Sequence, residues 1–390
     1  MNTKKALPIL FLVMFLVMVG FGIIIPVIPF YAEEIGATPT QLGLLMAVYS
    51  LMQFIFAPMW GRISDRIGRK PVIMIGILGL SLSFFLMALS TELWMLFAAR
   101  IIGGFLSSAN MPTVMAYVAD ITSEEDRGKG MGIIGASVGL GFIFGPAIGG
   151  VFSQTSLSTP FYLAGATSLV TFLFVTFILK ESLSAEQRSI QEKEKTTLLK
   201  ALSGPLSMLF LLQLFVSLSL SGLEATFAYF AAEKAGLGSV ELGYIFMIMG
   251  LAGAIVQGGL VGRLTKKLGE GIVIQLGIVI SAAGFGLILL TEGFGTAALF
   301  LTIFGVGNGL IRPSVSSLLT KKSTTGHGGT TGLLSSFDSL GRIIGPPLGG
   351  WLFSIAIGMP YISGIVLSMI ALVLYQFYQA RTKTSHSLDQ

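Results

Sequence analysis

The chain has 390 residues, of which 53% are hydrophobic and only 11% are charged. Soluble domains carry roughly 25% charged residues, so this chain cannot cover a surface that faces water, and we expect an integral membrane protein. It contains no cysteine and only two histidines, His327 and His386, neither of which lies in an apolar run. We therefore expect no disulfide, no metal site and no haem.

Apolar runs long enough to cross a bilayer, which takes about 20 residues, recur between charged or turn-rich breaks. In the first half they lie at about 7–32, 42–62, 71–90, 94–119, 130–152 and 160–179. In the second half they lie at about 205–231, 241–262, 271–290, 295–319, 329–352 and 359–380. The pattern predicts an all-α membrane protein with twelve transmembrane helices. We expect one six-helix bundle in residues 1–180, a charged cytoplasmic linker at 181–204 and a second six-helix bundle in 205–390.

The positions of the basic residues predict the orientation of the chain. If the N-terminus is cytoplasmic, 20 of the 24 Lys and Arg residues fall on the inner side. Lys234 falls outside, and Arg100, Arg312 and Arg342 lie within spans. This bias follows the positive-inside rule, so we expect both termini in the cytoplasm and the protein in a bacterial plasma membrane. Because topology accounts for the basic residues, we expect no nucleic-acid partner.

A ten-residue motif occurs once in each half, two hundred residues apart. Residues 141–150 read GFIFGPAIGG and residues 341–350 read GRIIGPPLGG. A membrane helix tolerates such a proline, and the glycines allow close helix packing. An even number of spans separates the copies, so the halves have the same orientation. This parallel repeat resembles the major facilitator superfamily, in which two bundles are related by pseudo-two-fold symmetry about the membrane normal and the substrate site lies between them.

The loop after the second span reads GRISDRIGRK at residues 61–70. It resembles the signature loop of that superfamily, G-x-L-x-D-R-x-G-R-K. The resemblance implies a cytoplasmic latch in which the aspartate caps a neighbouring helix N-terminus and pairs with the second arginine. The implied latch residues are Gly61, Asp65, Arg66, Gly68, Arg69 and Asp120. The second-half copy, at residues 262–269, lacks the aspartate, so we expect a one-sided latch.

The fifth span resembles the antiporter signature G-x-x-x-G-P-x-x-G-G, which is associated with export. The matching residues are Gly141, Gly145, Pro146, Gly149 and Gly150. We expect Gly145 and Pro146 to set the packing of this helix against the other half. Together the motifs make the chain resemble a twelve-helix drug/proton antiporter of the Bmr/NorA multidrug-efflux type. One position departs from that pattern, because those relatives have an aspartate where this chain has Asn308.

Charged residues within spans are costly and by default indicate function. Arg100 matches the superfamily signature R-x-x-x-G, and the resemblance implies a role in proton coupling; an arginine that snorkels or binds carbonyls is the alternative. Arg312 lies nearer its helix end, and we expect it to snorkel. Asp338 and Arg342 are one turn apart and can pair, either for function or for packing alone.

The charges of the second half have apolar counterparts in the first half, which argues for a function in the second half alone. We expect Glu224 to recognise a cation and Asp338 to carry the proton. The expected substrate-binding residues are Glu224, Phe227, Asn308 and Phe337. The expected proton-coupling residues are Arg100, Glu224, Asp338 and Arg342.

The sequence therefore predicts a transporter, not an enzyme, that exchanges an amphipathic cationic drug for protons by alternating access. We expect a monomer in the lipid bilayer, driven by the proton gradient without a cofactor. Two alternatives stay open. One is export of an endogenous metabolite, sugar or lipid on the same fold, and the other is a transport-inactive membrane sensor.

Overall fold

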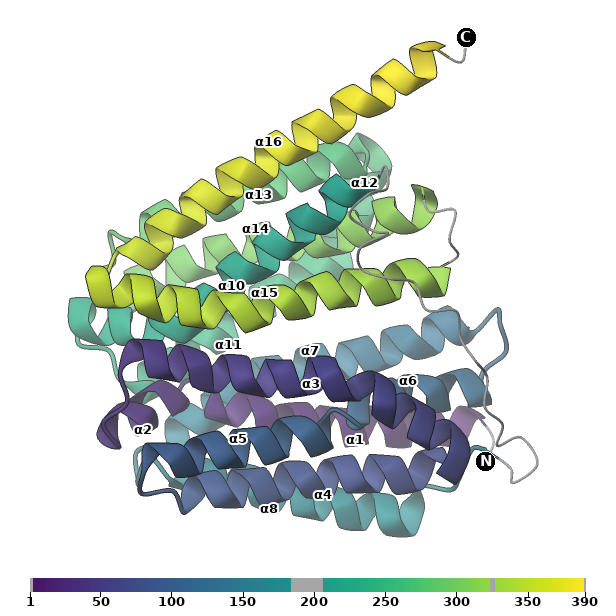
Figure 1. Cartoon of the computed structure of the whole chain (residues 1–390), viewed down its shortest axis with the longest axis vertical. Coiled ribbons are helices and arrows are strands. Elements are labelled where there is room, and N and C mark those ends of the chain that lie inside the picture. Colours follow the sequence, from purple (N-terminus) through teal and green to yellow (C-terminus); the bar gives the residue numbers. More distant parts are fainter. Residues whose placement is uncertain (1–2, 184–205, 323–326, 389–390) are drawn as a thin grey trace. The chain divides into compact units, whose positions relative to one another are not determined.

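The computed structural model describes residues 3–183, 206–322 and 327–388, and these contain α-helices and no β-strand. The first half contains α1 (Thr3–Ile24), α2 (Ile28–Glu34), α3 (Pro39–Ile67), α4 (Arg69–Ala88), α5 (Leu93–Ser107), α6 (Asn110–Ile121), α7 (Arg127–Phe152) and α8 (Thr159–Ile178) (Figure 1). The second half contains α10 (Ser207–Ala235), α11 (Ser239–Ile255), a π-helical turn (Val256–Leu260), α12 (Val261–Leu268), α13 (Glu270–Ile288), α14 (Phe294–Lys322), α15 (His327–Ile355) and α16 (Met359–Leu388). The predicted all-α fold is confirmed. Most of the predicted linker lies outside the described residues.

Within the described residues, eleven helical segments are long and apolar enough to cross a membrane. The one predicted span outside this set, 329–352, the eleventh in chain order, coincides with α15, which has 29 residues. Asp338, Arg342, two prolines and several glycines and serines make α15 less apolar than the others. A helix of this kind is stable in a membrane only where its polar groups face protein or water.

Three predicted spans are not single continuous α-helices. The first breaks at residues 25–27, where Pro26 supplies no N–H for a helical hydrogen bond. The fourth breaks at Ser108–Ala109 because the ring of Pro112 opposes the carbonyl four residues earlier. The eighth contains the π-helical turn, which includes Gly258 and Gly259. Sequence hydropathy placed these spans but could not show their interruptions.

The chain forms two compact units, each of which includes one short segment from the opposite half of the sequence. Unit 1 comprises residues 1–38, 48–193 and 238–247, and unit 2 comprises residues 39–47, 194–237 and 248–390. The two exchanged segments are the first turns of α3 and α11. They contain the repeated motifs Gln41-Leu42-Gly43 and Glu241-Leu242-Gly243.

In unit 1 the glycines of the antiporter motif pack α7 against α1. A side chain at Gly145 would come within 2.7 Å of the Cα atom of Gly22. Gly141 faces Met18 in the same way, and Gly149 faces the backbone of Ile23. Gly145 itself therefore packs on α1 of the first half, contrary to expectation, whereas Pro146 does meet the second half of the sequence: a Cβ atom at Gly243 of α11 would lie 2.5 Å from the carbonyl oxygen of Pro146. Only small residues permit such backbone contact.

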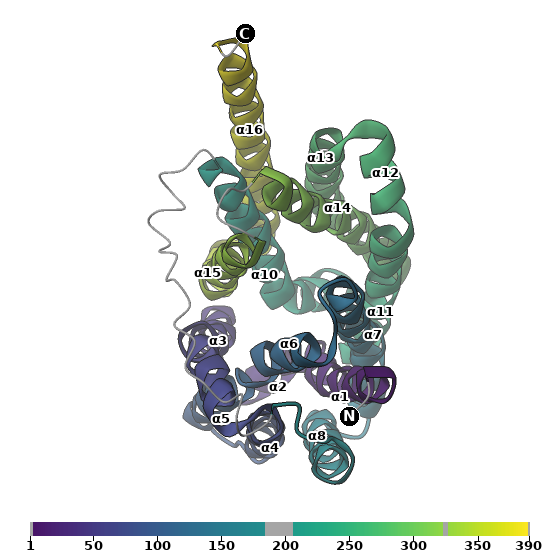
Figure 2. The same ribbon diagram turned by 90° about the vertical axis from the view of Figure 1, so that its right-hand side faces the viewer.

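Unit 2 repeats this arrangement with α10 and α15, which lie side by side in Figure 2. A Cβ atom at Gly341 would lie 2.6 Å from that of Ser217, and one at Gly349 would lie 3.0 Å from the Cα atom of Gly222. The Ser221 hydroxyl donates to the carbonyl of Gly341 at 3.0 Å. The repeated motif thus makes the same kind of helix contact in both units.

We predict that Gly145→Ala lowers the stability of the folded protein, because the added methyl group cannot fit against Gly22 without a backbone shift. Overpacking of this kind costs about 1–3 kcal/mol. Gly139→Ala is the matched control, since a Cβ atom at Gly139, on an exposed part of α7, meets nothing within 4 Å. The thermal midpoint of the purified protein in detergent should fall for Gly145→Ala only. Equal midpoints for the two variants would contradict the packing account.

Candidate functional site

Asp338 is the centre of a polar cluster within unit 2. Its Oδ2 atom lies 2.8 Å from Nη2 of Arg312 on α14 and 3.5 Å from Nε of Arg342 on α15. Its Oδ1 atom accepts a hydrogen bond of 3.2 Å from Nε2 of Gln213 and another from the hydroxyl of Ser217, both on α10. Three helices thus place donors on one carboxylate, so both of its oxygens are occupied.

Glu224 supplies the second negative charge near this cluster. It lies on α10, where the spacing from Gln213 and Ser217 places the three residues on one face. The side chain is half-buried and lies within electrostatic range of Arg342, Arg312 and Asp338. Among the described residues no ion pair to Glu224 is formed. Two arginines and two acids therefore give a group whose charges sum to zero when all four are ionised.

Arg312 corrects one expectation from the sequence. We expected its side chain to snorkel toward the helix end, but it pairs with Asp338. The i,i+4 spacing indicated the Asp338–Arg342 pair, which the structure contains. Gln213 and Ser217 were missed. The sequence did contain an indication of them, since two polar residues four apart on an otherwise apolar helix form a polar stripe.

Arg100 occupies the interior of unit 1. Its guanidinium carbon lies 5.0 Å from the centroid of the Tyr49 ring, a cation–π geometry. Only 5% of the residue is exposed, and its Nε atom has no hydrogen-bond partner among residues 3–183, 206–322 and 327–388. Gly104, one turn later, packs on the backbone of Tyr49, where a Cβ atom would lie 2.8 Å from the carbonyl oxygen. The R-x-x-x-G pattern thus brings arginine and tyrosine together, and the role of Arg100 in proton coupling stays a prediction.

Two aromatic residues expected to bind substrate lie in the core of unit 2 instead. Phe337 stacks on Phe210 with ring centroids 5.4 Å apart, and Phe227 is fully buried. Neither presents a surface to a ligand in this structure. The sequence identified them as aromatic residues near charged positions, but it could not show which helix face each one occupies.

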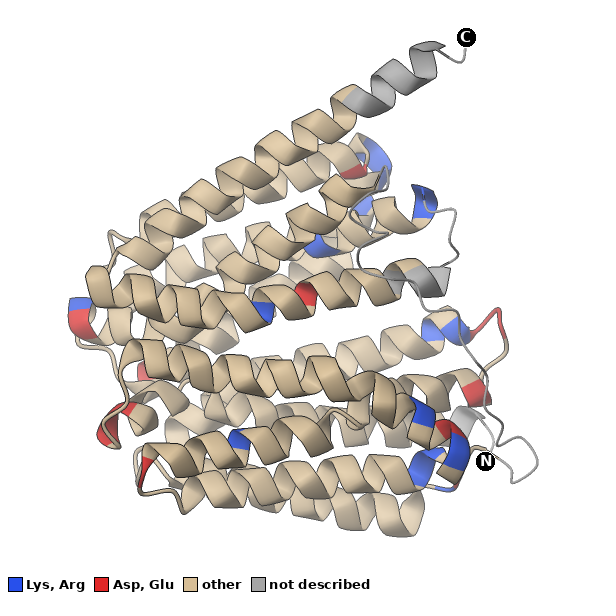
Figure 3. Ribbon diagram, in the orientation of Figure 1, with Lys and Arg blue, Asp and Glu red and all other residues tan. Residues whose placement is uncertain are grey.

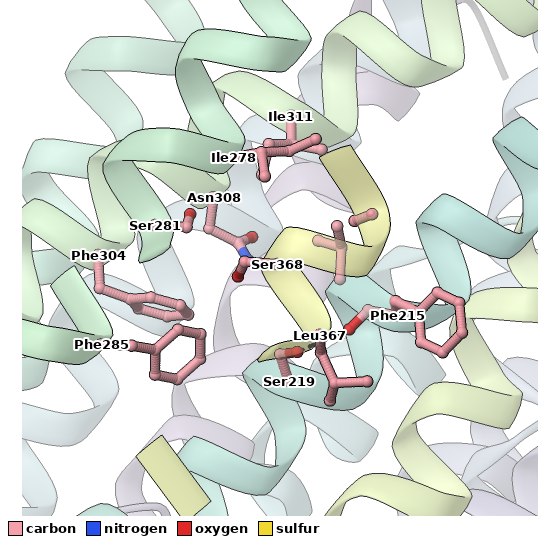
Figure 4. A pocket seen from close by; sticks show the side chains of 12 residues that line it. Phe215, Ser219, Ile278, Ser281, Phe285, Phe304, Asn308, Ile311, Leu367 and Ser368 are labelled. Atoms are coloured by element: carbon pink, nitrogen blue, oxygen red, sulfur yellow. Dashed lines mark hydrogen bonds between the residues drawn. The ribbon is translucent and has the colours of Figure 1, made fainter. Parts of the chain in front are cut away.

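Asn308 lines a small hollow among α10, α13, α14 and α16. Figure 4 shows its amide beside Ser368, with Ser281 and Ser219 also at the wall. The hollow measures about 280 Å³ between atoms, but its free space fits roughly one water molecule. The Ser281 hydroxyl has no hydrogen-bond partner in the part of the chain that the structure describes. This site suits a buried water rather than a drug, which does not support Asn308 as a substrate ligand here.

Most charged residues gather at the helix ends (Figure 3), and one such group contains the predicted latch. Arg69, the first residue of α4, donates to Asp65 Oδ1 at 2.5 Å and to Asp120 Oδ2 at 3.0 Å. It also donates to the Ser64 hydroxyl at 2.7 Å. Gly68 has a φ of 111°, which L side chains rarely adopt. Arg66 is exposed, and a Cβ at Gly61 would meet nothing closer than 3.9 Å.

Glu181 completes this group, although the sequence did not single it out. Its two carboxylate oxygens accept the backbone N–H groups of Arg69 at 2.9 Å and Lys70 at 3.1 Å. Ser182 donates to Asp120 Oδ2 at 2.9 Å. A carboxylate at a helix N-terminus satisfies free N–H groups and the positive end of the helix dipole. The residues that follow α8 are thereby tied to the latch loop. The expected contact of Asp65 with another helix N-terminus stays a prediction.

The second half contains an equivalent ion pair with reversed charges. Gly269 has a φ of 80°, and Glu270 follows it as the first residue of α13, as Arg69 follows Gly68. Glu270 pairs with Lys321 and accepts a 3.1 Å hydrogen bond from Ser317. Subtracting 201 from Glu270 and Lys321 gives Arg69 and Asp120. The second half thus has a charge-reversed counterpart to the Arg69–Asp120 pair but lacks the aspartate, and a one-sided latch stays a prediction.

A duplicated helical membrane protein with buried charges and an ion-pair network at its helix ends belongs to the class of secondary transporters. The family model described as Major Facilitator Superfamily matches residues 10–331. The chain belongs to the Major Facilitator Superfamily.

Relatives of known name match nearly the whole chain. "Multidrug resistance protein 2" of Bacillus subtilis (strain 168) is 33% identical over 395 residues, which cover 100% of this chain and 99% of the relative. "Quinolone resistance protein NorA" of Staphylococcus aureus (strain MSSA476) is 30% identical over 371 residues, which cover 95% of this chain and 96% of that protein. These identities over nearly the whole chain confirm the resemblance to the Bmr/NorA type.

Solved structures support the same fold. The nucleoside transporter NupG superimposes with a TM-score of 0.77 at 16% identity, covering 98% of this chain and 100% of that one. A bacterial homologue of the human lysosomal transporter Spinster, in an inward-facing and unoccupied conformation, gives a TM-score of 0.77 at 16% identity and covers 96% of each chain. At this identity the similarity concerns the fold alone.

We predict that Arg69→Lys reduces transport about tenfold or more, because one ammonium group cannot bridge Asp65, Asp120 and Ser64 as the guanidinium does. A hydrogen bond to a charged group contributes about 1.5–3 kcal/mol, and 1.4 kcal/mol corresponds to tenfold. Arg62→Lys is the control, since Arg62 is exposed, lies outside the implied latch residues, and both changes preserve the charge of the loop. Transport rates at matched membrane levels are the readout. Equal rates for Arg69→Lys and the wild type would show that transport does not depend on this ion-pair network.

Exchanging the two charges of the Glu270–Lys321 pair tests whether the pair contributes to stability. Glu270→Lys is expected to lower the thermal midpoint by placing like charges together, and Glu270→Lys with Lys321→Glu is expected to recover it. The effect should be small, about 1 kcal/mol or less, because 64% of the Lys321 side chain is exposed. Failure of the double variant to recover would show that Glu270 acts through Ser317 or the helix terminus instead.

Proposed function

We propose that this protein exports amphipathic cationic drugs across the plasma membrane in exchange for protons. The names of its relatives, which concern multidrug and quinolone resistance, support drug efflux. The location of 20 of 24 basic residues supports cytoplasmic termini. In this proposal the protein works as a monomer and uses the proton gradient without a cofactor.

The observation that carries the proposal is the state of Glu224. This acid is half-buried within a membrane helix, and among the described residues it forms no ion pair. A carboxylate in that position needs either a proton or a cation, since an uncompensated charge inside a membrane is costly. A proton and a cationic drug would therefore compete for Glu224, and this competition couples their movements.

Asp338 fits the proton-carrier role less well than Glu224. Its oxygens already accept bonds from Arg312, Gln213 and Ser217, with Arg342 beside them. Protonation would require these contacts to separate. We propose that Asp338 holds the two arginines in place and that Glu224 exchanges the proton. Arg100 remains a candidate for proton coupling in unit 1.

We predict that Glu224→Gln abolishes exchange, because an amide cannot alternate between proton and cation. Purified protein in liposomes with ethidium inside and a pH-sensitive dye outside measures both movements at once. The wild type should move protons when ethidium is supplied, and a protonophore should collapse ethidium accumulation. Glu233→Gln, a change at the exposed end of the same helix, is the control.

The expected loss is tenfold or more in both fluxes for Glu224→Gln, about 1.4 kcal/mol or more, with no change for Glu233→Gln. Proton-coupled ethidium flux that survives in Glu224→Gln would assign the exchange to another acid. Wild-type protein that binds ethidium without moving it would instead favour the transport-inactive sensor.

A further inference from the structure

The cluster around Asp338 contains more hydrogen-bond donors than acceptors. A guanidinium has five N–H groups, and Arg312 uses Nη2 toward Asp338 while Arg342 approaches it through Nε. Asp338 has no oxygen left, because Oδ1 accepts from Gln213 and Ser217. Among the described residues, no other acceptor engages these two guanidinium groups. Several of their N–H groups are therefore available to a ligand.

The exposed part of the cluster is positive. The side chains of Arg312 and Arg342 are 40% and 37% exposed, whereas that of Asp338 is 18% exposed. Charged groups within a span avoid lipid and face protein or a water-filled space. A dissolved molecule that reaches this space meets guanidinium groups before it meets the carboxylate.

The sum of the charges in the cluster also favours an anionic ligand group. With Asp338 ionised, the two arginines leave one positive charge that, among the described residues, only Glu224 lies in range to offset. In the proposed exchange, Glu224 is neutralised by a proton or by a substrate cation. At that stage one positive charge of the arginines is uncompensated, which a second, anionic group on the substrate would offset.

Helix packing does not require these arginines. The first-half counterparts of Arg312 and Arg342 are Met111 and Phe142, both apolar, in a unit with the same kind of α1–α7 contact. Two guanidinium groups were therefore not needed to build the fold. Their exposure and unused donors indicate a binding role.

We propose that Arg312 and Arg342 form an anion-binding subsite, so that the site accepts zwitterionic amphiphiles with a carboxylate on the arginines and an ammonium on Glu224. This inference rests on the proposed efflux function. Guanidinium groups bind planar carboxylates through parallel N–H bonds, whereas an ammonium group binds as a point charge. A purely cationic drug would use Glu224 alone and leave one positive charge of the arginines uncompensated.

The test uses two dyes that differ only at this group: a rhodamine with a free carboxylate and its methyl ester. Binding of each to the purified full-length protein is measured by fluorescence polarisation, and transport of each is measured in liposomes. The variants are Arg342→Gln and Arg342→Lys, and Arg263→Gln on the exposed part of α12 is the control. Arg312 remains paired with Asp338 in all of them, so the carboxylate keeps a partner.

We expect Arg342→Gln to weaken binding of the carboxylate dye about tenfold or more, the effect of losing a charged hydrogen bond. The methyl ester should bind with about the same affinity as before. Arg342→Lys should recover part of the loss, because it restores the charge but not the parallel bonds. Arg263→Gln should change neither affinity.

Equal weakening of both dyes by Arg342→Gln would overturn the subsite, because it would show a general structural effect. An unchanged affinity for the carboxylate dye would overturn it as well. If the wild type exports the ester but neither binds nor exports the acid, the efflux function stands and the anion subsite fails. If it binds neither dye, both proposals fail.

Discussion

The contact between the backbones of α10 and α15 determines the chemistry of unit 2. The glycines of α15 allow the two helices to approach so closely that the Ser221 hydroxyl reaches the carbonyl of Gly341. At this separation Ser217, which has a short side chain, and Gln213 both bond to Asp338, one turn before Gly341. A larger side chain at the glycines would separate the helices and leave the carboxylate with arginine partners alone. Helix packing and the polar cluster are therefore one feature.

The two halves share their helix-packing geometry but differ in the charged side chains that they place on it. Both units use the glycine motif to join two helices, and both place a positive-φ glycine before the helix that follows the loop. The residue after that glycine is Arg69 in one half and Glu270 in the other, and each finds an opposite charge at the equivalent position. The two halves therefore share the position of this ion pair but not its direction. The buried polar cluster, by contrast, has no first-half equivalent.

The sequence was informative where a property is local and less informative where it depends on a distant partner. The helices and the Asp338–Arg342 pair follow from long apolar runs or from a spacing of four residues, and the pair of Asp65 with Arg69 follows from the resemblance of their loop to the family signature. The partner of Arg312 is 26 residues away on another helix, and Glu181 is 112 residues from the N–H that it caps. Neither contact has a periodic signal. For Gly145 the sequence indicated a small helix face but not that α1 covers it.

The cost of a net charge inside the membrane constrains how the cluster can work. Each of its four charged groups was placed in a low-dielectric region, so the sum of their charges must stay near zero as the protein cycles. Three of them, Arg312, Arg342 and Asp338, are bound to one another, and only Glu224 changes its charge without breaking an ion pair. Any ligand that neutralises Glu224 must therefore either leave a net positive charge behind or bring its own anion. This condition links the number of protons exchanged to the charge of the substrate.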